Sequence, residues 1–463
     1  MKTALPSLHA PAPLSRAAAP PASVPAAAAD PPDSFLEKLG FLLLCVFLFL
    51  AFSRVADFVL PSLHLPLVSS LMALGAVFLS GGVQRALSSS VGKLLVVFTV
   101  WLFFITPFGY WRGGSVTLLK DTWIKSFLVY FLIAGLIRTL RHCRRVMFVL
   151  ALAGLTVALI SLLFGSRLEG RLVVSAGSLA NSNAIAFLIL ITAPFWGVVA
   201  LNDTHIPFRR VMVGLAILPM FGAVLMTGSR AALVVLAVLG VTFFLFASFA
   251  NKLKLFFVFL VAVVLASLLV PGTLVERYRT LVGETGNQRP NEAVASKMER
   301  IALVKSSIAM TLRHPFFGVG PGNFQPASAA EAKDRGEPIF WRETHNTYTQ
   351  VSSETGIPGF LLYISILFLS LRSTVRLYKQ SRLRPDLPGV AGMAFCLLAS
   401  LLSFCAGALF GSSAYELYVP ALAGLAVAFT AVAQRALQSQ PAPAAAPVSC
   451  PAPRPSVRRP FPA

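Results

Sequence analysis

The sequence is poor in charged residues, and acidic residues are the scarcer kind. Only 12% of its 463 residues are charged, whereas roughly 25% are charged in a soluble protein. Asp and Glu together number 18, beside 39 Lys and Arg. Cysteine is also rare, and four of the five cysteines lie in or beside apolar stretches, so neither a disulfide framework nor a metal cluster is indicated. This composition excludes a soluble globular enzyme and a disordered chain.

Apolar residues take the place of the missing charge. They make up 56% of the chain, and the mean hydropathy is +0.76. Apolar runs of about 20 residues recur along most of the sequence, which is the length a helix needs to cross a hydrocarbon layer roughly 30 Å thick. The runs are continuous rather than alternating, which excludes a β-barrel. The sequence therefore predicts an all-α polytopic membrane protein.

About twelve transmembrane helices are predicted. They are expected at residues 35–53, 61–81, 92–110, 123–140, 146–164, 181–200, 211–227, 231–250, 254–271, 356–372, 388–410 and 415–434.

The formal net charge of +21 follows from short Lys/Arg clusters between these spans. The clusters all fall in even-to-odd connections, and such a bias marks the cytoplasmic loops of a membrane protein. They contain Arg138, Arg141, Arg144, Arg145, Arg209, Arg210, Lys252, Lys254, Arg372, Arg376, Lys379, Arg382 and Arg384. Both termini are then predicted to be cytoplasmic. Nucleic-acid binding is not expected, because no basic face with interleaved aromatic residues is present.

This topology divides the chain into five parts. Residues 1–33 and 437–463 are Pro/Ala-rich, and we expect them to form disordered cytoplasmic tails. Residues 34–271 hold the first nine transmembrane helices, and residues 356–436 hold the last three. Between them, residues 272–355 are too polar for a membrane span and too long for a simple connection, so they are predicted to form a periplasmic loop.

The periplasmic loop contains one predicted amphipathic helix. Asn291 is a plausible N-cap and Pro315 a plausible stop. Apolar residues recur between them at steps of three or four, and they are Val294, Met298, Ile301, Val304, Ile308 and Leu312. We expect this helix to lie on the membrane surface or over the spans, with Arg300 on its flank.

Three glycines follow this helix within five residues. Gly318, Gly320 and Gly322 allow a backbone to approach a ligand closely, and they equally suit a structural turn. The turn is not a nucleotide-binding loop, since no Gly-Lys-Ser/Thr follows it.

Several ionisable residues are predicted on the same outer side as the long loop. Arg171 follows the fifth span, Arg230 lies in a very short connection between the seventh and eighth spans, and Arg300 and His345 lie in the long loop. Ionisable groups at a membrane boundary are functional candidates. A charge that extends from a helix end toward water is the alternative for Arg230.

The order of these motifs resembles the O-antigen ligase and polymerase superfamily of bacterial membrane glycosyltransferases. The resemblance rests on Arg171 with residues 177–183, on residues 228–230, on Arg300 upstream of residues 314–320, and on residues 345–348 leading to 354–359. One departure is Ala180-Asn181-Ser182-Asn183, where many members of the family have Asn-Pro-Asn.

The resemblance implies a GT-C-like helical fold and an undecaprenyl-diphosphate-linked glycan as donor. An acceptor hydroxyl must lose a proton when it attacks such a donor, and His345 is the expected base. Glu343 and Glu354 are second-choice bases. Arg230 and Arg300 are the expected ligands of the departing diphosphate, because guanidinium groups bind its oxygens bidentately. The further substrate-binding candidates are Arg171, Asn181, Asn183, Gly318, Gly320, Asn346 and Glu343.

Neither a cofactor nor a metal is expected, because the sequence has no Asp-x-Asp pair and its arginines can supply the positive charge. Three functions remain open. A ligase would transfer the glycan to lipid A core, and a polymerase would use a second lipid-linked glycan as acceptor. A transporter would instead place ionisable groups near the membrane midplane. If the protein is a ligase or a polymerase, we expect it to be a multi-pass protein of the bacterial inner membrane, in contact with membrane lipids. Its active site is then expected to face the periplasm.

Overall fold

The computed structural model describes residues 34–438 with some gaps. The gaps are 60–62, 64, 169, 175–176, 203–207, 247–251, 254–259, 261–271, 273–277, 279–289, 338, 340 and 385–386. The chain separates into residues 1–32 and residues 33–463, and every described residue lies in the second unit. Three predicted parts of the chain lie outside the described residues. They are the N-terminal tail, the C-terminal tail beyond residue 438, and the ninth span except Leu260.

The described chain is built almost wholly from helices. The longer helices are α1 (Phe35–Ser53), α3 (Leu65–Leu79), α5 (Ser90–Ile105), α7 (Ile124–Leu136), α8 (Leu140–Phe164), α9 (Ser182–Thr192), α11 (Arg209–Met226), α12 (Arg230–Phe246), α15 (Pro290–Arg313), α16 (Phe324–Asp334), α17 (Thr347–Ser381), α18 (Pro388–Gly407) and α19 (Tyr418–Gln438). The short elements include α2 (Val55–Val59), α4 (Gly82–Leu87), α6 (Arg112–Leu118), α10 (Trp196–Asn202) and the antiparallel strands β1 (Ser166–Leu168) and β2 (Arg171–Val173).

The first helix shows how local sequence sets a helix end. The Ser34 side chain accepts a hydrogen bond from the backbone N–H of Glu37, and the Glu37 carboxylate accepts one from the backbone N–H of Ser34. This capping box satisfies two backbone donors that a helix start otherwise leaves unpaired. The helix ends at Arg54, which has a left-handed backbone conformation. Its bounds agree with the predicted first span.

Eight helical segments within the described residues are long and apolar enough to cross a membrane, which is the make-up of a multi-pass membrane protein. Two apolar helices, α3 and α12, are shorter than the others. The predicted fourth span, residues 123–140, corresponds to α7, which ends at Leu136. A π-helical turn at Leu119–Trp123 joins α7 to α6 before it. The all-α fold is therefore confirmed, whereas the number of twelve spans stays a prediction.

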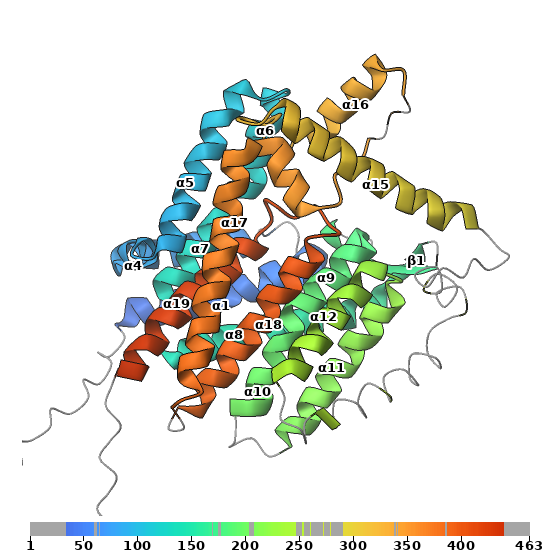
Figure 1. Cartoon of the computed structure of the whole chain (residues 1–463). Coiled ribbons are helices and arrows are strands. Elements are labelled where there is room, and N and C mark those ends of the chain that lie inside the picture. Colours follow the sequence, from blue (N-terminus) through green and yellow to red (C-terminus); the bar gives the residue numbers. More distant parts are fainter. Residues whose placement is uncertain are drawn as a thin grey trace, which may run out of the picture. The chain divides into compact units, whose positions relative to one another are not determined.

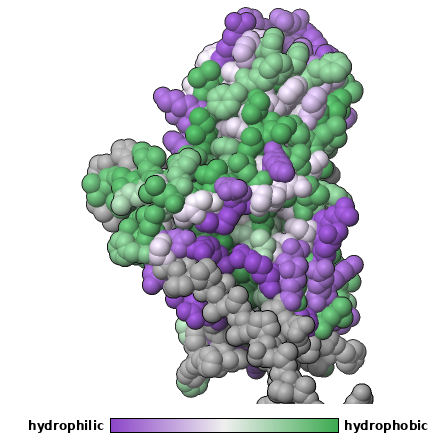
Figure 2. Space-filling view, turned by 90° about the vertical axis from the view of Figure 1, so that its left-hand side faces the viewer, coloured by the Kyte–Doolittle hydropathy of each residue, from purple (hydrophilic) through white to green (hydrophobic). Residues whose placement is uncertain are grey.

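Many apolar side chains on the spans face outward. On α5, Val97, Val100, Phe103 and Phe104 are each about half exposed. Figure 2 shows the side of the molecule that carries α5. A broad hydrophobic surface covers it, and hydrophilic residues gather above and below that surface. Such a surface is too large for a soluble monomer and suits contact with lipid tails.

One continuous hydrophobic core extends from α1 to α19. Helix α17 packs against α5, α15, α18 and α19, and α18 also packs against α9, α10 and α12 (Figure 1). The Ser400 hydroxyl of α18 donates a 2.7 Å hydrogen bond to the carbonyl oxygen of Ile191 in α9. Helices α17 and α18 thereby connect the N-terminal spans to the middle of the chain.

The predicted amphipathic helix exists as α15, but its apolar stripe is not its packed face. Met298, Ile301, Ile308 and Leu312 are exposed. The packed face instead carries Leu303, Ser307, Met310 and Thr311. The Thr311 hydroxyl lies 2.9 Å from that of Ser352 in α17. The helix therefore presents its apolar stripe outward, as a helix on a membrane surface does.

Helix α17 begins at Thr347, earlier than the predicted tenth span, so the end of the predicted loop 272–355 is helical. Asn346 explains the early start, since its side-chain oxygen accepts hydrogen bonds from the backbone N–H groups of Tyr348 and Thr349. The helix is broken at Gly356, which has φ +70°. A short polar segment thus precedes the apolar part of α17.

Candidate functional site

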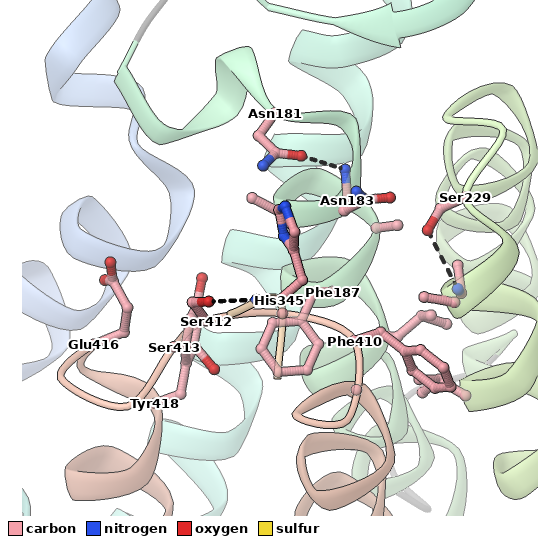
Figure 3. Close-up of a pocket in the computed structure, with 18 of the residues that line it drawn as sticks. Asn181, Asn183, Phe187, Ser229, His345, Phe410, Ser412, Ser413, Glu416 and Tyr418 are labelled. Carbon is pink, nitrogen blue, oxygen red and sulfur yellow. Dashed lines mark hydrogen bonds between the residues drawn. The ribbon is translucent and has the colours of Figure 1, made fainter. Parts of the chain in front are cut away.

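A pocket of about 140 Å³ lies where four segments of the chain meet. These segments are the start of α9, the start of α12, residues 343–345 before α17, and residues 407–418 between α18 and α19. Its polar lining consists of Asn181, Asn183, Ser229, Glu343, His345, Ser412, Ser413, Glu416 and Tyr418. Figure 3 shows the His345 ring extending toward Asn181 and Asn183. We call this the His345 pocket.

His345 is held in an unusual backbone conformation. Its φ is +50°, which is uncommon for a residue other than glycine and is often found at functional sites. The backbone N–H of His345 donates a 3.0 Å hydrogen bond to the Ser412 hydroxyl oxygen. Two residues later, the Thr347 hydroxyl donates a 2.7 Å hydrogen bond to the carbonyl oxygen of Gly411. These bonds fix the His345 segment to the loop after α18.

The surroundings of His345 favour its neutral form. Burial lowers the pKa of His345 below its usual value, and the positive charges of Arg300 and Arg342 lower it further. The carboxylate of Glu299 acts in the opposite direction. A neutral imidazole has a free lone pair, so His345 can accept a proton at neutral pH.

Two carboxylates share the pocket with His345. Partial desolvation raises the pKa of Glu343, the negative charge of Glu416 raises it further, and a hydrogen bond with Ser412 opposes both. Glu416 is absent from the set of sequence-predicted residues. The predicted last span, residues 415–434, includes Glu416, which directly follows the odd-to-even connection at residues 411–414. That connection has the same parity as the loop with His345. Ser412, from the same connection, was missed as well.

Arg171 joins two walls of the pocket. Its Nε donates a 2.9 Å hydrogen bond to the carbonyl oxygen of Thr227, and its Nη2 donates one of 2.9 Å to Oδ1 of Asn183. This bond fixes the orientation of the Asn183 amide, and its nitrogen keeps two N–H donors. Asn181 caps α9, since its side-chain oxygen accepts from the backbone N–H of Asn183.

The other two predicted arginines lie beside the pocket rather than in its lining. Arg230 begins α12, and its neighbours Ser229 and Ala231 both line the pocket. Arg300, in α15, is near enough for its charge to act on His345. Both arginines are half-buried. The structure thus gathers Arg171, Arg230 and Arg300 around one polar pocket from three separate parts of the sequence.

The glycine turn lies outside the pocket and has a structural role. Gly318 and Gly320 have φ of +65° and +96°, which favour glycine. The backbone N–H of Gly320 donates a 2.9 Å hydrogen bond to the carbonyl oxygen of Glu354, so the turn packs on α17 just before its break. The structure shows that these glycines form a turn, and their contact with a substrate stays a prediction. Asn346 likewise caps a helix and does not line the pocket.

Glu354, a second-choice base in the sequence analysis, is buried and fully engaged. Its carboxylate accepts hydrogen bonds from the backbone N–H groups of Gly322 and Phe324 and from the Tyr415 hydroxyl. Tyr415 immediately precedes Glu416 of the pocket. Glu354 therefore connects the glycine turn to the loop that carries Ser412 and Glu416.

Four of the ten predicted site residues line the His345 pocket, and they are Asn181, Asn183, Glu343 and His345. Within the described residues, no group of three or more His, Cys, Asp or Glu side chains is arranged to hold a metal ion.

The fold and this pocket define a multi-pass membrane protein with a His/Glu site at the ends of its helices, flanked by arginines. Residues 215–364 match the O-antigen ligase family. This match confirms the predicted resemblance to the O-antigen ligase and polymerase superfamily. It includes Arg230, Arg300 and His345 and ends before Ser412 and Glu416. A comparison with curated proteins finds no match to the chain.

Proposed function

We propose that the protein is a metal-independent membrane glycosyltransferase that moves a glycan from undecaprenyl diphosphate to a sugar hydroxyl of lipid A core. The observation that carries this proposal is the placement of His345 in a pocket flanked by arginines, within a segment of the O-antigen ligase family. We further propose that the protein lies in the bacterial inner membrane and that the pocket faces the periplasm, as the distribution of Lys and Arg predicts.

In the proposed reaction, the acceptor hydroxyl oxygen attacks the anomeric carbon of the donor sugar. Nitrogen of neutral His345 takes the hydroxyl proton as the new glycosidic bond forms. The bond between the anomeric carbon and the diphosphate oxygen breaks, and the diphosphate leaves with the bonding electrons. Arg230 and Arg300 stabilise its negative charge, as positive groups held beside a leaving diphosphate do.

Two carboxylates beside His345 give the pocket polar groups for an acceptor sugar. Glu343 and Glu416 both accept hydrogen bonds from hydroxyl groups when ionised. The amide nitrogen of Asn183, which Arg171 orients, adds a donor. These groups support a site for a sugar, whereas a transporter would place such groups near the middle of its helices. Here the polar lining belongs to the first turns of α9 and α12 and to the residues just before α17.

The test is transfer by the purified full chain in nanodiscs, supplied with synthetic undecaprenyl-diphosphate glycan and either lipid A core or a second lipid-linked glycan. His345→Ala should reduce turnover roughly 10²–10⁴-fold, the usual contribution of a general base. His314→Ala is the matched control, because His314 is exposed and lies outside the pocket. Full activity of His345→Ala would contradict the mechanism. Product formation only with the second lipid-linked glycan would identify a polymerase instead of a ligase.

The proposed orientation has its own test in intact cells. A cysteine introduced at Ala330 should react with a membrane-impermeant thiol reagent, and one introduced at Gln380 should not. The reverse pattern would overturn the periplasmic placement of the site.

A further inference from the structure

A second polar cavity lies at the other ends of α17 and α19. It has a volume of about 700 Å³. Four arginines line it, Arg85, Arg372, Arg376 and Arg435, and no carboxylate is among its described lining residues. We call it the arginine pocket. Arg435 follows Tyr418, which lines the His345 pocket, by 17 residues of α19, about 26 Å at the usual rise, so the two pockets lie toward opposite ends of that helix.

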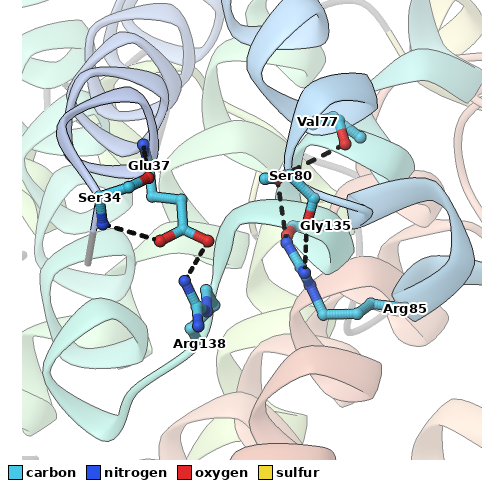
Figure 4. Close-up of polar contacts among 7 residues, drawn as sticks. All are labelled: Ser34, Glu37, Val77, Ser80, Arg85, Gly135 and Arg138. Carbon is cyan, nitrogen blue, oxygen red and sulfur yellow. Dashed lines mark hydrogen bonds and ion pairs between the residues drawn. The ribbon is translucent and has the colours of Figure 1, made fainter. Parts of the chain in front are cut away.

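Among the residues that the structure describes, no carboxylate lines the pocket as a counterion. Arg85 is anchored by hydrogen bonds from Nη1 to the carbonyl oxygen of Ser80, 2.6 Å, and from Nη2 to that of Gly135, 2.7 Å (Figure 4). Backbone carbonyls bind a guanidinium without cancelling its charge. The carboxylate whose charge reaches Arg85 is that of Glu37, and it is ion-paired with Arg138. The positive charges of Arg138 and Arg435 also reach Arg85.

Arg372 and Arg376 are one helical turn apart on α17, and both are exposed. Within the described part of the chain, neither makes a hydrogen bond or an ion pair. Two guanidinium groups at this spacing, beside Arg85 and Arg435, form a site in which an anion would relieve mutual repulsion.

The same two arginines also border an apolar groove of about 720 Å³ on the other side of α17. Phe246 of α12, Phe368 and Leu371 of α17, and Leu398 and Leu402 of α18 line this groove. An anionic ligand held by Arg372 and Arg376 can therefore extend an apolar chain into it. Both glycerophospholipids and polyprenyl phosphates join a phosphate group to a long hydrocarbon chain, and we take a glycerophospholipid as the occupant because such lipids surround every membrane-spanning chain.

We propose that the arginine pocket and the adjoining groove form a specific site for an anionic glycerophospholipid. Its phosphodiester binds Arg372 and Arg376, with Arg85 and Arg435 completing the positive lining, and one acyl chain lies in the groove. Basic pockets between transmembrane helices are suited to such headgroups. The lipid site requires that the chain is inserted in a membrane, and it does not require glycosyl transfer. The lipid proposal can therefore fail while the proposed function holds, and the proposed function can fail while the lipid proposal holds.

The test measures lipid binding to the purified full chain in a neutral detergent, by native mass spectrometry and by the thermal unfolding midpoint. Phosphatidylglycerol should bind and raise the midpoint, and zwitterionic phosphatidylcholine should not. Arg372→Gln/Arg376→Gln should weaken phosphatidylglycerol binding roughly 30-fold, since each basic residue contributes about one kcal/mol of attraction to anionic lipid. Unchanged binding by this double variant would overturn the proposal.

The matched control is Arg141→Gln/Arg145→Gln. These two arginines are also one helical turn apart, are exposed on α8, and line neither the pocket nor the groove. The control removes the same charge, so it should bind phosphatidylglycerol as the unaltered chain does. An equal loss in both double variants would show that net charge alone attracts the lipid, which would also overturn the proposal.

Two further measurements complete the test. Phe368→Ala tests the groove, and binding of glycerol phosphate distinguishes a lipid ligand from a free phosphate ligand. Phe368→Ala should weaken phosphatidylglycerol binding, and Phe103→Ala, which alters a similarly exposed ring on α5, should not. Glycerol phosphate has the headgroup chemistry without the chains, so it should bind far more weakly. If it matched phosphatidylglycerol, the ligand would be a free phosphate and the lipid assignment would be wrong.

Discussion

The backbone N–H of His345 and the hydroxyl of Ser412 are joined by a 3.0 Å hydrogen bond across 67 residues of sequence. The same hydroxyl lies 3.2 Å from that of Thr344 and also contacts the Glu343 side chain. Ser412 thus ties the segment with the proposed base to the loop with Glu416. The site depends on this contact as well as on the family motifs that precede it.

Ser412→Ala should lower activity without abolishing it. Loss of one hydrogen bond of about 1 kcal/mol that positions His345 predicts a roughly fivefold fall in kcat. KM for the donor should change little, because the proposed diphosphate ligands are unaltered. Steady-state kinetics in nanodiscs measures both. Ser373→Ala, on α17 and outside the His345 pocket, serves as control, and equal kinetics in the two variants would argue against a positioning role.

The pH dependence of transfer should follow His345. Only the neutral imidazole accepts a proton, so activity should fall as the pH drops through the pKa of His345. That pKa lies below the usual value, because of burial and the charge of Arg300, which places the acid limb below about 6.5.

Arg300→Gln should move this acid limb to higher pH, since it removes a positive charge that disfavours protonated His345. Lys305→Gln, an exposed charge elsewhere on α15, should leave the limb in place. The measurement is kcat/KM between pH 5 and 8. A shift of the acid limb to lower pH in Arg300→Gln would show that a group other than His345 controls this limb.

Part of the site was predictable because its residues belong to local sequence motifs. His345 lies within the residues that match the O-antigen ligase family, and Asn181 and Asn183 lie in a short polar stretch directly before an apolar run. Helix ends such as that of α1 have local capping signals. Glu416 and Ser412 have no such local signal, because they enter the pocket only through the packing of α18 and α19 against α17.

The packed face of α15 shows a related limit of sequence patterns. Its apolar stripe predicted the helix, yet the helix packs through Leu303, Ser307, Met310 and Thr311. In a membrane protein, an apolar face has two possible neighbours, lipid and protein. Periodicity alone cannot distinguish them, and the hydrogen bond between Thr311 and Ser352 selects the protein-facing side here.

Arg171→Lys should impair transfer although it keeps the charge. The guanidinium of Arg171 donates to Thr227 and Asn183 at once, and an ammonium has no planar fork to reproduce both bonds. Loss of one hydrogen bond to a charged donor predicts a roughly tenfold or greater fall in kcat/KM. Arg167→Lys, on the exposed strand β1, is the matched control. Equal activity of Arg171→Lys and the unaltered chain would remove Arg171 from the site.

Glu354→Gln should destabilise the chain, because two backbone N–H groups and the Tyr415 hydroxyl converge on its carboxylate. An amide has one oxygen to offer, so at least one buried donor loses its partner at a cost of about 1–3 kcal/mol. A lowered thermal midpoint in detergent would report this loss. Glu337→Gln, at an exposed surface ion pair, should leave the midpoint unchanged. If Glu354→Gln kept its midpoint but lost activity, Glu354 would act as more than a structural link.

Arg230→Ala should weaken donor binding as well as turnover, because the donor diphosphate is already charged in the ground state. Arg230→Lys should recover only part of the binding, since an ammonium lacks the bidentate geometry of a guanidinium. Arg210→Ala is the matched control, because Arg210 is exposed near the start of α11 and lies outside the pocket lining.

Donor affinity and single-turnover rate should be measured separately, with and without a chelator. With arginines as the source of positive charge, EDTA should leave both quantities unchanged. Loss of activity in EDTA that magnesium restores would show that a metal, rather than Arg230 and Arg300 alone, stabilises the departing diphosphate.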